Sequence, residues 1–251
     1  MEWHTDQYVT AAERTRDDGT VLAVTLDRPA KRNALPFDTV GTLTALFEQV
    51  DREEVDAVVV RGEGEHFSSG MDVAAATREQ FLDPDESGSV HDLVAAVRDA
   101  PVPVLAAVEG NAYGTGFFLC MAADFVVAAP DATFALPEVT LGMPAGAYTP
   151  ALLPQLVGER RARDWLLTGR TVGAEEADQA GFVTTVTTTL DEAVEDLLDT
   201  LLANGGLAIS LLKDELATLP ADREAVKQRE TEAMRTAWTE GDVADRLAEL
   251  F

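Results

Sequence analysis

Two turns of small residues and one isolated carboxylate are the parts of this chain whose residue types could do chemistry. The first turn is Ser68-Ser69-Gly70-Met71-Asp72, which follows an apolar run at Ala57–Val60. The second is Gly114-Thr115-Gly116, which opens an apolar, helix-like run that reaches Cys120. Backbone N–H groups in the first turn of a helix have no intrahelical acceptor and lie at the positive end of the helix dipole. Each turn could therefore aim a backbone N–H at a ligand.

Glu138 is the carboxylate, and it follows the second turn by about twenty residues. Two N–H donors can hold a developing oxyanion, while a single carboxylate beside it takes up and returns a proton. The pattern predicts polarisation of a carbonyl next to a lone acid–base group. We expect Glu138 to be half-buried against Phe117, Phe118 and Leu136, with burial raising its pKa toward neutrality.

The elements that must position these groups alternate between strands and helices. A strand pair is expected at Tyr8–Arg14 and Thr20–Leu26. Further apolar runs of strand length lie at Ala57–Val60, Val102–Val108 and Phe125–Ala128, with helical spacing at Phe37–Gln49 and His91–Arg98. This order predicts an α/β fold with a largely parallel, buried sheet.

The last quarter of the chain has a helical pattern only. Helices are expected at Leu190–Ala203, Leu207–Leu219, Arg223–Trp238 and Val243–Leu250. We therefore divide the chain into a core that carries the site, residues 1–189, and a helical region suited to subunit contacts, residues 190–251. The stretch Thr77–Ser89, rich in Glu, Asp, Ser and Pro, is expected to be an exposed loop or a poorly formed helix.

Composition excludes several classes of partner. The 251 residues carry a formal net charge of −26 without a basic stripe, which argues against nucleic acid and anionic membranes as partners. No apolar run is long enough for a membrane span, and the start lacks a secretory signal, so a cytoplasmic protein is expected. The dispersed acidic surface resembles that of proteins from salt-loving organisms. Loss of the fold on transfer from molar KCl to dilute buffer would support that hypothesis.

Metal and cofactor motifs are not evident. His4, His66 and His91 have no ligand-like spacing with one another or with Cys120, so no metal site is expected. Gly62-Glu63-Gly64 lacks the third glycine of a dinucleotide fingerprint. Cys120, the only cysteine, cannot form an internal disulfide and is expected to be a buried structural thiol.

Five segments, in this order and spacing, resemble the crotonase superfamily, the enoyl-CoA hydratase/isomerase family. They are LDRPAKRNAL at Leu26–Leu35, HFSSGMD at His66–Asp72, AVEGNAYGTG at Ala107–Gly116, AADFVVAAPDATFALPEV at Ala122–Val139 and LGMPAG at Leu141–Gly146. The resemblance covers roughly Val21 to Lys213. It implies a spiral of β-β-α units with a C-terminal all-helical region, assembled as a homotrimer or a dimer of trimers. It also implies an acyl-CoA thioester as ligand, with coenzyme A as part of the substrate and no separate cofactor.

The same resemblance implies roles for individual residues. The oxyanion hole would be formed by the backbone N–H groups of Met71 and Thr115. Thr115 stands where the family usually has glycine, which is tolerable if its φ is negative. The basic loop would meet the CoA phosphates through Lys31 and Arg28. Further candidates for substrate binding are Ser69, Gly70, Asp72, Gly114, Phe118 and Tyr148, although Asp72 could instead anchor its own turn.

The choice of reaction depends on Phe118. Hydratases of this family use two glutamates, and Phe118 occupies the first of those positions, which leaves Glu138 alone. Moving a double bond from position 3 to position 2 needs one base, which takes a proton from C2 and returns it at C4. We therefore expect an enoyl-CoA isomerase. A hydratase, another enolate reaction such as decarboxylation, dehalogenation or thioester hydrolysis, and a non-catalytic acyl-CoA-binding protein remain alternatives. The acyl chain length stays open.

Overall fold

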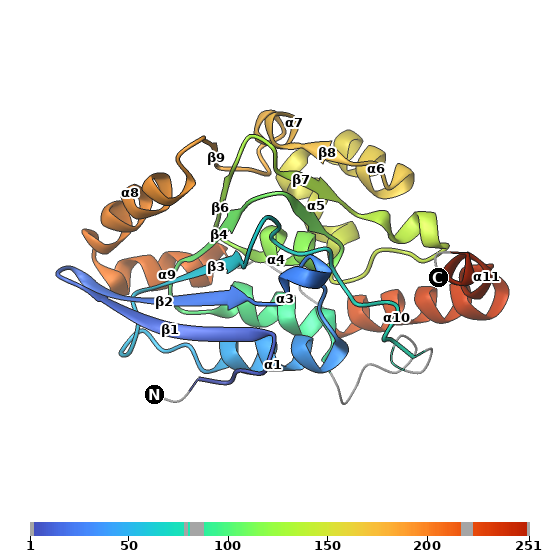
Figure 1. Ribbon diagram of the computed structural model, residues 1–251, viewed down its shortest axis with the longest axis horizontal. Helices are drawn as coiled ribbons and strands as arrows, with labels where there is room; N and C mark the ends of the chain where they lie inside the picture. Colours follow the sequence, from blue (N-terminus) through green and yellow to red (C-terminus); the bar gives the residue numbers. More distant parts are fainter. Residues whose placement is uncertain (1–2, 78–79, 81–87, 217–222, 250–251) are drawn as a thin grey trace.

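The chain forms a six-stranded sheet in the order β1-β2-β3-β4-β6-β9 (Figure 1), in a computed structural model that describes residues 3–77, 80, 88–216 and 223–249. Its strands are β1 (Val9–Arg16), β2 (Gly19–Leu26), β3 (Ala57–Gly62), β4 (Val104–Val108), β6 (Phe125–Ala128) and β9 (Thr185–Val186). β1 and β2 pair antiparallel, and the other neighbours pair parallel. The predicted α/β class with a largely parallel sheet is confirmed.

Successive side chains of a strand point to opposite faces of the sheet. Both sets of side chains are buried in this sheet. One face, with Val60, packs in a core shared with helices α1 (Phe37–Glu48), α3 (Val90–Asp99) and α4 (Thr115–Ala122). The other face, with Val59, packs against Val194 and Leu198 of α8 (Leu190–Leu202). Both faces are covered, which is why these strands read as continuous apolar runs. Residues 190–202 therefore share a core with the sheet.

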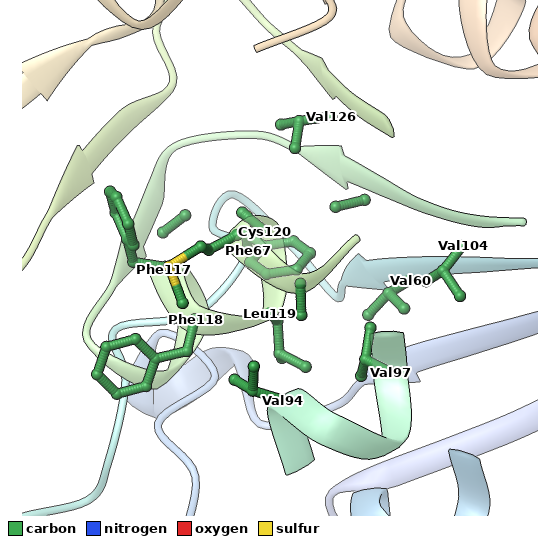
Figure 2. Packing of buried hydrophobic residues seen from close by; sticks show 14 of the residues in the cluster. Val60, Phe67, Val94, Val97, Val104, Phe117, Phe118, Leu119, Cys120 and Val126 are labelled. Carbon is green, nitrogen blue, oxygen red and sulfur yellow. The ribbon is translucent and has the colours of Figure 1, made fainter. Parts of the chain in front are cut away.

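Helix α4 is buried along its whole length. A helix that is apolar all round belongs in a core, and Figure 2 shows Leu119 directed toward Val94 of α3. Cys120 is buried, as expected, and burial raises the pKa of its thiol. Packing on all sides fixes the first turn of α4, which contains Thr115.

A smaller three-stranded sheet and three helices were not anticipated from the sequence. The sheet has the order β5-β7-β8, formed by β5 (Asn111–Tyr113), β7 (Thr133–Ala135) and β8 (Val172–Gly173). The helices are α5 (Thr149–Val157), α6 (Glu159–Thr168) and α7 (Ala174–Gln179), and two short 3₁₀ helices, η1 (Pro29–Lys31) and η2 (Pro137–Leu141), precede them. β5 and β7 flank the turn at Gly114 and the segment leading to Glu138.

The C-terminal helices follow the expected pattern, with α9 at Gly206–Leu216, α10 at Arg223–Glu240 and α11 at Val243–Ala248. Lys213 of α9 pairs with Asp124, whose carboxylate also accepts the N–H of Val104 at 2.8 Å. Asp124 is thus a structural residue that joins α9 to the sheet. The expectation for Thr77–Ser89 falls mostly outside the described residues.

The described residues contain neither a helix suited to cross a membrane nor a metal-binding cluster. None of the helices there combines the length and the apolar character that crossing a bilayer requires. No group of three or more His, Cys, Asp or Glu side chains in the same ranges is arranged to hold a metal ion.

Candidate active site

The first turn leaves the N–H of Met71 free between two bonded neighbours. The N–H of Gly70 donates to Ser68 Oγ at 3.1 Å, and the N–H of Asp72 donates to the carbonyl of Leu35 at 2.8 Å. Within the described chain, the N–H of Met71 has no acceptor. The turn therefore holds one donor in a fixed direction while its other backbone N–H groups are paired.

Asn33 positions this turn and was missed in the sequence. Its side chain is buried and donates to the carbonyls of Glu63 and His66 at 3.0 and 2.7 Å, while its Oδ1 accepts the N–H of Arg28 at 2.8 Å. Its φ is +54°, a conformation that asparagine adopts more readily than most residues. In the sequence, the only indication of this role is an asparagine within the basic loop that begins at Arg28.

The second turn presents the N–H of Thr115. Gly114 has φ +50° and donates its own N–H to Ala135 at 3.0 Å, and Thr115 begins α4. Among the described residues the N–H of Thr115 has no acceptor, as expected for the first position of a helix. Positive φ occurs at Gly114 and not at Thr115, so the condition for replacing the usual glycine is met.

The two turns touch each other. A Cβ on Gly70, whose φ is +91°, would lie 2.6 Å from the carbonyl oxygen of Tyr113 and 3.2 Å from the nitrogen of Thr115. The N–H of Tyr113 donates to the carbonyl of Ser68 at 2.9 Å. Contact this close needs glycine at position 70, and it brings the two free N–H groups to one place.

Glu138 lies next to this pair of donors. It is in η2, and its Oε1 is 3.2 Å from the point that a Cβ on Gly114 would occupy. Its Oε2 is buried without a hydrogen-bond partner among the described residues. This burial raises the pKa of Glu138 to about 7, as the sequence predicted. A carboxyl group with that pKa can take up and release a proton near neutral pH.

A single pocket contains these groups. Of the residues named from the sequence, its lining includes Ser69, Met71, Gly114, Thr115, Phe118 and Glu138. Most of the remaining wall is apolar, from Phe37, Val73, Leu141, Met143 and Met234. The arrangement suits an apolar group with a carbonyl at the two donors and a carbon acid at Glu138.

Two of the contacts expected from the sequence are wrong. Phe117 does not flank Glu138; its ring stacks on Phe182 at 4.5 Å, inside an aromatic cluster with Trp165. Tyr148 does not line the pocket in the described structure, and its ring packs edge-on against His91. Adjacent residues of a helix point in different directions, which explains why Phe118 reaches the pocket and Phe117 does not.

Two basic residues of the loop differ in their contacts. The side chain of Arg28 is bonded within the protein, and Lys31 is exposed. Arg28 donates to Asp72 at 2.6 Å and to the carbonyl of Ala34 at 3.1 Å, and its guanidinium lies over the ring of Tyr8. Arg28 and Asp72 therefore hold the Met71 turn, and neither lines the pocket in the described residues. Lys31 is exposed and lies outside that pocket lining as well.

Two polar residues of the pocket were missed. His91, in the first turn of α3, and Glu230 of α10 both line it, with Nε2 and Oε2 2.7 Å apart. From the sequence, the side chain of His91 was considered only when a metal site was excluded, and Glu230 was not singled out. They are 139 residues apart in sequence, so no local pattern predicts the contact.

Comparison with known proteins decides the family. The model of the enoyl-CoA hydratase/isomerase family matches residues 16–242. The chain belongs to this family. Curated relatives include the carnitinyl-CoA dehydratases of Citrobacter koseri and Salmonella typhi, each 36% identical over 78% of this chain and covering 76% and 77% of the relative.

Solved structures of the family have the same fold. An enoyl-CoA hydratase from Mycobacterium avium subsp. paratuberculosis K-10 is 27% identical, with a TM-score of 0.84 over 96% of this chain and 98% of its own. A putative enoyl-CoA hydratase from Streptomyces coelicolor A3(2) is 33% identical, with a TM-score of 0.76 over 99% and 92%. The crotonase-like fold expected from the sequence is confirmed.

Proposed function

We propose that this family member is an enoyl-CoA isomerase that moves the double bond of a 3-enoyl-CoA to position 2. The thioester oxygen accepts hydrogen bonds from the N–H groups of Met71 and Thr115. Glu138, as the carboxylate, removes a proton from C2, and the electrons spread over a dienolate held by the two donors. Glu138 then gives the same proton to C4. Donors of this kind contribute roughly 3–4 kcal/mol each to the stability of the charged intermediate.

The observation that carries this proposal is that Glu138 lies against the donor turn, whereas the other carboxylate of the described pocket lining, Glu230, is paired with His91. Phe118 lines the same pocket at the position where the family resemblance implies the first of the two glutamates of a hydratase. Proton transfer between two carbons of one substrate needs one base. Water addition needs in addition a group that orients and deprotonates water, which phenylalanine does not supply.

A second candidate is reversible water addition to, or removal from, an acyl-CoA. It is favoured by the names of the relatives that are 36% identical, which are dehydratases. In that reaction Glu138 would exchange the C2 proton, and another pocket residue would act on the oxygen at C3.

Separate incubations with a 3-enoyl-CoA and a 2-enoyl-CoA distinguish the two candidates. We expect the 3-enoyl ester to gain the absorbance of a conjugated thioester without a change in mass. An increase in mass by one water, starting from the 2-enoyl ester, would instead establish the second candidate. A 3-enoyl ester recovered unchanged, under conditions where the protein is folded, would contradict the isomerase assignment.

The pH dependence of the isomerase follows from the raised pKa of Glu138. The carboxylate is the active form as a base, so kcat/KM for the 3-enoyl ester should rise with pH through about 7 and level off above it. Below the midpoint we expect about a tenfold fall per pH unit. Stopped-flow absorbance between pH 5 and 9 checks this profile; a plateau that extends down to about pH 5 would contradict it.

The CoA end of the substrate is proposed to meet Lys31. Arg28 is tied to Asp72, whereas Lys31 is exposed on η1, and the carbonyl of Lys31 accepts a hydrogen bond from Ser69 Oγ at 3.3 Å. Lys31 thus lies beside a residue of the pocket wall. An ammonium there can pair with a phosphate at the pocket entrance.

We further propose that the protein assembles through α9 as a homotrimer or a dimer of trimers. Four leucines of this helix are 57–72% exposed, Leu207, Leu211, Leu212 and Leu216. Such a group of exposed apolar side chains is typical of a contact surface.

Leu211→Glu combined with Leu212→Glu should dissociate the oligomer, because two charges would have to be buried in an apolar contact. Light scattering coupled to gel filtration in molar KCl measures the mass. Leu167→Glu, at a leucine of α6 that is 69% exposed, is the matched control. An unchanged mass for the α9 variant would contradict this interface.

A further inference from the structure

The pair formed by His91 and Glu230 is the least expected part of the pocket. The side chains are only 7% and 11% exposed, and they come from α3 and from the C-terminal helix α10. Glu230 Oε2 accepts the N–H of Tyr148 at 3.1 Å and lies 2.7 Å from His91 Nε2. The ring of His91 meets the ring of Tyr148 edge-on, with centroids 4.9 Å apart. The pair is therefore held in one geometry from two sides.

Both members keep hydrogen-bonding capacity that the described residues do not use. Oε1 of Glu230 and Nδ1 of His91 have no partner there. Both residues line the pocket, whose wall is otherwise mostly apolar. A hydrogen bond formed in a mostly apolar site is electrostatically stronger than one formed in water. A ligand in the pocket is the available partner.

Holding α10 in place does not account for the pair. Two other ion pairs already join α10 to α3, between Arg223 and Asp99 and between Lys227 and Asp92 at 3.1 Å. None of these four residues lines the pocket. An apolar contact at positions 91 and 230 would dock the helix without withdrawing polar groups from water.

We propose that His91 and Glu230 bind a hydroxyl group carried by the acyl chain, so that the substrates are hydroxylated acyl-CoA thioesters. With the proton of His91 on Nε2, where it bonds Glu230, a hydroxyl can donate to Nδ1; with both ring nitrogens protonated, the hydroxyl can accept from Nδ1 and donate to Oε1 of Glu230. The isomerase uses C2 and C4 at Glu138, so the hydroxyl lies further along the chain. This inference rests on the proposed use of the pocket for an acyl-CoA.

Binding of saturated esters tests the inference apart from catalysis. Hexanoyl-CoA, 5-hydroxyhexanoyl-CoA and 6-hydroxyhexanoyl-CoA are titrated into the full-length protein by calorimetry in molar KCl. We expect at least one hydroxylated ester to bind about tenfold more tightly than hexanoyl-CoA, the gain typical of a good hydrogen bond in a desolvated site. His91→Phe should abolish the preference while keeping the ring contact with Tyr148.

Two further variants make the result specific. Glu230→Gln keeps an oxygen for the N–H of Tyr148 and should reduce the preference by several-fold, which covers the case in which His91→Phe does not fold. Lys227→Met removes an ion pair between α10 and α3 outside the pocket and should leave the preference unchanged. Equal binding of all three esters, or a preference that survives in a folded His91→Phe protein, would overturn the hydroxyl site alone. No binding of any ester would overturn the acyl-CoA function together with it.

Discussion

Glu138→Gln is expected to lower kcat for isomerisation by about 10³-fold or more, with little change in the binding of a saturated acyl-CoA. The amide has nearly the same shape, but it cannot take the proton from C2. The measurements are the stopped-flow rate with a 3-enoyl-CoA and calorimetric binding of hexanoyl-CoA. Full retention of the rate would remove Glu138 from the mechanism.

The same substitution has an opposite effect on stability, which serves as its control. The pKa of Glu138 is raised to about 7 by burial, so the folded state favours the protonated form. The stabilising contribution of that form is complete at acidic pH and is lost as pH rises through about 7. Glu138→Gln should therefore melt above the wild type at pH 8, and the difference should shrink toward pH 5. An inactive variant that is also less stable at pH 8 would indicate damage to the fold.

Gly70→Ala should have the second large effect, a fall in kcat/KM of about 10²–10³-fold. The new Cβ would lie 2.6 Å from the carbonyl oxygen of Tyr113, a backbone atom that cannot rotate away, and the φ of +91° adds strain. The two turns must separate, and the two N–H donors then no longer converge on one oxygen. Steady-state kinetics with a 3-enoyl-CoA measures the loss.

Gly173→Ala is the matched control for this substitution. It lies outside the pocket lining, its φ is −79°, and a Cβ there meets nothing within 4 Å. We expect unchanged kinetics and unchanged melting for Gly173→Ala. If Gly70→Ala kept wild-type kinetics in the same assay, the backbone donors of the two turns would not be what stabilises the intermediate.

The elements that could be predicted from the sequence are those with a strong hydrophobic periodicity. The strands β1 to β4 and β6 and the helices α1, α3 and α8 to α11 have long apolar patterns, and they match the expected segments to within a few residues. β5, β7, β8 and β9 have only two or three residues each, too few for a period to be visible. Those short strands depend on their tertiary partners.

The candidate site was predictable where its function rests on local backbone. The turns at Met71 and Thr115 and the carboxylate of Glu138 are read from short segments, and the structure brings all three to one pocket. Contacts between segments that are distant in the sequence could not be predicted. The tie between Arg28 and Asp72, and the pair of His91 with Glu230, arise from packing of loops and helices that no local pattern specifies.

The C-terminal helices also form part of the surroundings of the candidate site. α11 contacts the segment that carries Glu138: Arg246 donates to the carbonyl of Thr140 at 3.3 Å, and a Cβ on Gly142 would lie 3.0 Å from Asp242. α10 adds Glu230, Thr231 and Met234 to the pocket wall. The two donor turns lie within residues 68–116, so a substitution in α10 or α11 changes the pocket wall or the contacts of the Glu138 segment without altering either backbone donor. Variation in these two helices can therefore change which ligands fit the pocket while the groups proposed to do the chemistry stay the same.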